Sequence, residues 1–123
     1  MTIKPARLIW CLSTKADKKV WLIELKIGSS DTLLRCMLEI ATYYQLLDKD
    51  LFIESYKDIL GNLKADCIRK AVLVYREKFQ HKEIKDMMGG ERSNLKKLAD
   101  VLKIDFFLIK EQPSVFTVQR VPL

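Results

Sequence analysis

The chain has 123 residues, of which 49% are hydrophobic and 31% are charged, and its formal net charge is +6. This balance is typical of a globular domain and argues against a disordered segment. No apolar run reaches the ~20 residues that a membrane span needs, and the start, MTIKPARLIW, lacks the pattern of a secretory signal. We therefore expect a soluble cytoplasmic protein with a single domain over residues 1–123.

The first half of the chain predicts two strands and two helices. Runs of β-branched and aromatic residues predict strands over 7–13 and 20–27, joined by a polar turn. Apolar residues then recur at helical spacing, which predicts amphipathic helices over 31–47 and 51–63. A pair of serines before the first helix supplies its N-cap, and Gly61 ends or weakens the second.

The second half predicts three strands, one longer helix and a polar connection. The strands are expected over residues 69–76, 104–109 and 115–121. The helix is expected over 93–102, capped by Ser93 or Asn94, and the preceding polar segment leaves room for a short helix. The order β β α α β α β β, with a crossover between the third and fourth strands, predicts an α/β fold with a mixed central sheet. Because several strands are apolar throughout, we expect helices to flank both faces of that sheet.

Two charged residues interrupt the apolar strand VWLIELKI. Alternate side chains share one face of a strand, so Glu24 and Lys26 lie on the same face, near its carboxyl end. A buried carboxylate needs water, a cation or a partner, and open α/β sheets place ligands beyond the carboxyl ends of their strands. One interpretation is a phosphodiesterase site, with Glu24 holding Mg²⁺ or Mn²⁺ and Lys26 acting on the attacking water. The other is a partly exposed ion pair where the strand leaves the core.

With a strand before it and an amphipathic helix after it, this segment resembles the PD-(D/E)XK nuclease superfamily, whose core runs α-β-β-β-α-β. IELK at 23–26 corresponds to the second half of the family motif. The resemblance implies a restriction-endonuclease-like core, Glu24 as catalytic metal ligand and Lys26 as catalytic lysine. The family carries an aspartate on the preceding strand, where this chain has Ile9 or Trp10. That difference implies that any endonuclease activity is weak or lost.

Basic residues near the predicted turns and helix ends suggest a nucleic-acid-binding surface, with DNA favoured over RNA. These residues are Lys15, Lys18, Lys19, Arg69, Lys70, Arg92, Lys96 and Lys97. They also fit an ordinary solvated surface. The apolar final strand predicts an edge that is covered or paired, and hence a possible homodimer. The alternative function is therefore a non-enzymatic dimeric interaction or regulatory module, in which Glu24 and Lys26 are structural.

The three cysteines, Cys11, Cys36 and Cys67, lie far apart and form no paired motif. This spacing predicts reduced thiols rather than a disulfide framework. His81 is the only histidine, so it would have to serve as the base of any Cys–His dyad. A single histidine with scattered cysteines is also a poor pattern for zinc. Neither a cysteine nucleophile nor a zinc centre is expected.

Overall fold

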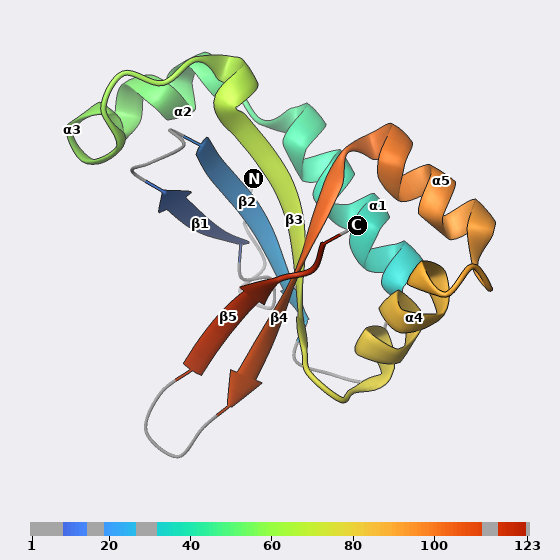
Figure 1. The fold of residues 1–123 in the computed structure, drawn as a ribbon. Coiled ribbons are helices and arrows are strands. Elements are labelled where there is room, and N and C mark those ends of the chain that lie inside the picture. The colour runs from blue at the N-terminus through green and yellow to red at the C-terminus, as the bar shows by residue number, and fades with distance from the viewer. Residues whose placement is uncertain (1–8, 15–18, 27–31, 112–115, 123) are drawn as a thin grey trace.

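The computed structural model describes residues 9–14, 19–26, 32–111 and 116–122. Their five strands form one sheet in the order β1-β2-β3-β4-β5 (Figure 1). The strands are β1 (Ile9–Thr14), β2 (Lys19–Lys26), β3 (Ile68–Tyr75), β4 (Ile104–Glu111) and β5 (Phe116–Arg120). The pairs β1–β2 and β4–β5 are antiparallel, whereas β2–β3 and β3–β4 are parallel. The described sheet is therefore mixed, as predicted, and the final strand lies at its edge.

The described helices follow the predicted α/β pattern. They are α1 (Leu33–Leu46), α2 (Lys49–Ser55), α3 (Lys57–Leu60), α4 (Phe79–Met88) and α5 (Ser93–Leu102), with a 3₁₀ turn at Ala65–Cys67. α1, α2, α3 and the 3₁₀ turn lie between β2 and β3, and α4 and α5 lie between β3 and β4. None of the described helices has the length and apolar character that a bilayer crossing requires.

The helix starts and ends differ from the predictions for local reasons. Thr32 caps α1, its Oγ1 accepting a hydrogen bond from Arg35 N at 3.2 Å, while the serine pair proposed for this role lies outside the described residues. The helix predicted over 51–63 is interrupted at Tyr56 and ends at Gly61, where φ is 75°. α5 has its predicted bounds, but no side-chain hydrogen bond caps it at Arg92, so the predicted serine or asparagine cap is wrong.

The main core lies between one face of the sheet and three helices. Ile40 of α1, Met87 of α4 and Ala99 of α5 pack in one buried cluster with Val72 and Phe106 from the strands. α1 contacts both β2 and β3, and Figure 1 shows α1, α4 and α5 on the same side of the sheet. β2, the E-x-K strand that carries Glu24 and Lys26, therefore lies inside the sheet, beneath α1.

The opposite face of the sheet carries a smaller apolar cluster. Its six members are all buried: Trp21, Ile23, Ala71, Leu73, Phe107 and Ile109. The rings of Trp21 and Phe107 meet edge to face, with centroids 5.8 Å apart. In the part of the chain that the structure describes, no helix belongs to this cluster. The expectation of helices on both faces is thus wrong there, because these apolar side chains pack across neighbouring strands.

Candidate functional site

Glu24 occupies an interior position of the sheet and not an opening at its end. It lies opposite Ile9 of β1 and Val72 of β3, and its side chain is 0% exposed. It shares a strand face with Leu22, which belongs to the helix-covered core, and it is engaged in an interaction within the chain. The expectation that Glu24 meets solvent at a cleft is corrected. The backbone of Lys26 pairs with Val74, and its side chain lies outside the described residues.

The described residues do not fit a magnesium or manganese site around Glu24. Within them, no group of three His, Cys, Asp or Glu side chains is placed to hold a metal ion. Ile9, the residue opposite Glu24 on the preceding strand, offers no ligand atom in its side chain. Mg²⁺ prefers several oxygen ligands in octahedral geometry. One buried carboxylate is therefore an insufficient donor set.

A second buried carboxylate, Glu83 of α4, holds the start of α1. Its Oε1 accepts a hydrogen bond from Leu33 N at 3.0 Å, and its Oε2 lies 3.6 Å from Arg92 Nη2. The first N–H groups of a helix have no partners inside the helix. Glu83 and Thr32 satisfy two of them in α1, which gives Glu83 a structural role and ties Arg92 to the fold.

The predicted basic residues fall into two groups at opposite ends of the parallel strands. One group lies where β2 and β3 begin: Lys19, Arg69 and Lys70. The other lies before and along the first half of α5: Arg92, Lys96 and Lys97. Ten helical residues span about 15 Å, and α5 ends where β4 begins, beside Lys70. The residues of the predicted nucleic-acid-binding surface therefore form two separate groups, and Lys15 and Lys18 lie outside the described residues.

Carboxylates neutralise two of the three cations at the start of α5. Arg92 faces Glu83, and Lys96 Nζ lies 2.9 Å from Asp100 Oδ1. Lys97 is exposed. This group consequently presents less net positive charge than its sequence suggests.

Three lysines from different elements gather at the other end, and we call them the lysine cluster: Lys49, Lys70 and Lys103. The ammonium groups of Lys49 and Lys70 lie 4.1 and 4.2 Å from the centroid of the Tyr44 ring, within cation–π range. Lys49 Nζ also donates a hydrogen bond to Tyr44 O at 3.0 Å. Burial lowers the pKa of Lys70, and the nearby charges of Lys49 and Lys103 lower it further. The cluster is therefore a region of concentrated positive potential.

Sequence reasoning found only one member of the lysine cluster. Lys49 lies between Asp48 and Asp50, so the local sequence suggests a neutral surface. Lys103 is the single residue between α5 and β4, and its backbone is left-handed, with φ 55°. The parallel β3–β4 register brings Lys70 opposite Ile104, next to Lys103. This proximity depends on strand pairing, which the sequence alone does not specify.

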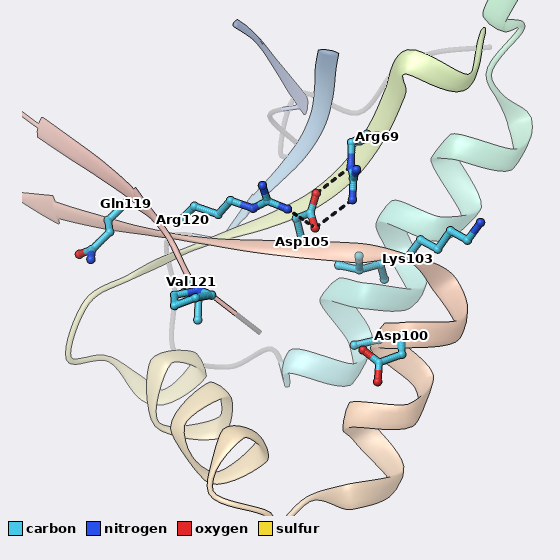
Figure 2. Close-up of a pocket in the computed structure, with 10 residues that line it drawn as sticks. Arg69, Asp100, Lys103, Asp105, Gln119, Arg120 and Val121 are labelled. Carbon is cyan, nitrogen blue, oxygen red and sulfur yellow. Dashed lines mark hydrogen bonds and ion pairs between the residues drawn. The ribbon is translucent and has the colours of Figure 1, made fainter. Parts of the chain in front are cut away.

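Asp105 lies at the same end of the sheet as the lysine cluster, but its side chain is on the other face. There it binds two arginines (Figure 2). Its Oδ2 accepts hydrogen bonds from Trp21 Nε1 at 2.7 Å and from Arg69 Nε at 3.0 Å. Its Oδ1 accepts hydrogen bonds from Arg69 Nη2 at 3.3 Å and from Arg120 Nη2 at 3.1 Å. The guanidinium of Arg120 also lies 5.9 Å from the Trp21 ring centroid. The predicted basic residue Arg69 is thus fixed in position by an acid that sequence reasoning did not single out.

A pocket of about 730 Å³ adjoins this network. It is bounded by the last turn of α5, the start of β4, and the end of β5 with the residues that follow it. Figure 2 shows Arg69 and Arg120 reaching Asp105 from different sides, whereas Lys103 extends away from it. The pocket therefore combines two oriented guanidinium groups with an apolar wall formed by Ala99, Ile104, Val121 and Pro122.

Comparison with known proteins found no family model, no curated protein and no solved structure that matches this chain.

His81 should make stability depend on pH. Its side chain is buried, and its Nδ1 accepts a hydrogen bond from Glu77 N at 2.9 Å. Burial lowers the pKa of His81; Lys85 and Arg76 act in the same direction, and the Glu77 carboxylate opposes them. We expect the free energy of unfolding to fall as pH drops below about 6.5, the ordinary histidine pKa, because the unfolded chain then gains a proton that the folded chain does not bind.

This loss should level off once the pH is below the lowered pKa of the folded protein. Urea unfolding between pH 8 and pH 5 measures it. The His81→Asn variant keeps an acceptor for Glu77 N but does not titrate, so its dependence should be shallower. Equal pH dependence in the two proteins would contradict a role for His81.

The Asp105→Asn variant should be less stable than the parent protein. An amide of the same shape can still accept the Trp21 hydrogen bond, but it removes the charge that binds both arginines. We expect a loss of about 1–2 kcal/mol in the free energy of unfolding, because the bonds involve charged groups but the arginines are partly exposed. Urea unfolding at pH 7 measures the loss. The Asp100→Asn variant, which changes an exposed acid on α5, should lose much less.

Proposed function

We propose that this chain binds nucleic acid through the phosphate backbone, using the lysine cluster, on a scaffold similar to that of the PD-(D/E)XK nucleases. DNA is the favoured ligand, and hydrolysis is weak or lost. The observation that carries the proposal is the gathering of Lys49 and Lys70 around Tyr44, with Lys103 close enough for its charge to act on Lys70. None of the three has an ion-pair partner among the described residues.

Like charges held close together repel: burial is the main cause of the lowered pKa of Lys70, and the charges of Lys49 and Lys103 lower that pKa further. A polyanion relieves the repulsion between the three positive charges. Lysines that neutralise phosphates also release condensed counterions from DNA, which makes binding strongly salt-dependent and indifferent to sequence.

The arrangement around the E-x-K strand supports the resemblance in scaffold. β1 and β2 form an antiparallel pair, Glu24 and Lys26 lie on the second of them, and α1 leads on to β3. This order corresponds to the second and third strands, the helix and the last strand of the family core. The carboxylate set does not correspond, because Ile9 faces Glu24 and the described residues offer no metal-binding group. We therefore propose binding in preference to catalysis.

Binding to a labelled DNA fragment across a salt series tests the lysine cluster. The Lys49→Gln/Lys70→Gln variant should bind all sequences more weakly, and the slope of log K against log salt should fall by about 1 per lysine. The control is Lys97→Gln, an exposed lysine in the middle of α5 and outside the lysine cluster. An equal loss in the control would indicate a general charge effect and contradict this surface. Absence of salt-dependent binding by the parent protein would reject nucleic-acid binding.

A cleavage assay tests the proposed loss of catalysis. Plasmid and single-stranded DNA are incubated with Mg²⁺ or Mn²⁺ and the parent protein, the Glu24→Gln variant or the Lys26→Ala variant. We expect no metal-dependent cleavage above the background shared by all three proteins. DNA affinity should be unchanged in Glu24→Gln, because the side chain is buried. Cleavage by the parent protein that both substitutions abolish would establish a nuclease.

One observation favours the alternative of a dimeric interaction module. β5 pairs with β4 on one side only among the described strands, and Val118 is 49% exposed. An unpaired apolar edge is a common place for a second strand to add. A concentration-dependent dimer in sedimentation equilibrium, combined with no DNA binding, would favour this alternative.

A further inference from the structure

We propose that the pocket beside Asp105 binds one nucleotide unit of a single strand, with its phosphate at Arg69 and Arg120. This inference rests on the proposed function, because the adjoining lysine cluster would hold the rest of the strand. It names the class of nucleic acid: a single strand or a single-stranded end, and not a continuous duplex.

The two arginines are oriented before any ligand arrives. Asp105 binds both guanidinium groups, and its own side chain is only 12% exposed. A guanidinium has five N–H donors, of which Arg69 uses two and Arg120 uses one on Asp105. Both therefore retain donors for a second anion. The parallel N–H donors of a planar guanidinium match the geometry of phosphate oxygens. An arginine that is already held in place loses little side-chain entropy on binding.

The charge of the pocket favours an anion. Its lining contains three cations, Arg69, Lys103 and Arg120, and two acids, Asp100 and Asp105. Lys96 forms an ion pair with Asp100, and Asp105 already accepts hydrogen bonds from three side chains. The remaining charge is positive, and the lysine cluster adds to it through Lys103, which belongs to both sites.

The size of the pocket favours a phosphate that carries a substituent. Its volume of about 730 Å³ falls within the range of roughly 300–1,000 Å³ typical of small-molecule sites. The apolar wall opposite the arginines suits a sugar or the edge of a base. A base inside a duplex is paired and stacked, and moving it into a pocket carries the free-energy cost of unstacking. A single strand has no pairing to lose.

The pocket and the lysine cluster share Lys103 at the end of the sheet, where a strand can pass from Lys70 on one face to the arginines on the other. Lys103 lines the pocket, and its charge acts on Lys70, while Figure 2 shows its side chain extending away from Asp105. Lys103 therefore lies between the arginine pair and the remaining lysines. Successive phosphates of one strand can contact the lysine cluster and then the arginines.

Binding of a single-stranded oligonucleotide is compared with binding of a duplex of the same length, using the parent protein and three variants. The parent protein should prefer the single strand. Arg120→Gln should weaken single-strand binding about tenfold, the effect of losing one charge-assisted hydrogen bond, with little change for the duplex. Arg120→Lys keeps the charge but loses the paired N–H donors of the guanidinium, so it should lose a large part of the preference for single strand over duplex. Lys97→Gln should leave the preference unchanged.

Calorimetric titration with adenosine monophosphate and with adenosine measures binding to the pocket without a contribution from the rest of a nucleic-acid strand. The monophosphate should bind the parent protein more tightly than adenosine does, and Arg120→Gln should remove this difference. Thermal unfolding confirms that each variant folds, which is expected because Trp21 and Arg69 still bind Asp105 in Arg120→Gln.

The outcomes distinguish the two proposals. If the monophosphate binds in a way that depends on Arg120 but DNA does not bind, the proposed function is rejected. The pocket would then be a site for free nucleotides and not for a nucleic-acid strand. DNA binding through Lys49 and Lys70 with equal affinity for single strand and duplex, unaffected by Arg120→Gln, would overturn the pocket alone. A parent protein that binds adenosine and its monophosphate equally would also overturn it.

Discussion

Asp105 joins four of the five described strands through its side chain. It lies on β4 and accepts hydrogen bonds from Trp21 on β2, Arg69 on β3 and Arg120 on β5. Backbone hydrogen bonds connect only neighbouring strands, whereas this carboxylate links β2 directly to β4 and β5 across the sheet face. The same bonds hold the arginines that line the pocket. The stability of this end of the sheet and the geometry of the candidate binding site therefore depend on one acid.

The interior position of Glu24 changes the interpretation of the E-x-K strand. A carboxylate can be catalytic with a metal only if other ligands and a path for substrate reach it. Glu24 is fully buried on the face that α1 covers, opposite Ile9. The presence of Glu24 and Lys26 on one strand is therefore not enough for a metal site, because the described surroundings lack the other ligands. The positive surface lies at the start of the parallel strands, away from their carboxyl ends.

Local sequence patterns predicted most of the strands and helices, since alternation and helical periodicity are properties of neighbouring residues. They missed the length of α4, because Gln80, His81 and Glu83 are polar yet buried on its inner face, so the helix does not look amphipathic. Arg69 and Lys70 were found from the sequence, but Lys49, Lys103 and Asp105 were not. Their roles arise from contacts between residues far apart in the chain, which depend on strand register and packing.

The connection between α5 and β4 consists of Lys103 alone. The backbone is left-handed at that residue, and the chain passes from helix to strand with no further loop residue. An inserted residue could not be absorbed in a loop; it would rotate α5 or move β4 along its neighbours by one position. Such a shift would exchange the two faces of β4, placing Asp105 against the helices and Phe106 on the opposite side. This joint should therefore tolerate substitutions far better than changes in length.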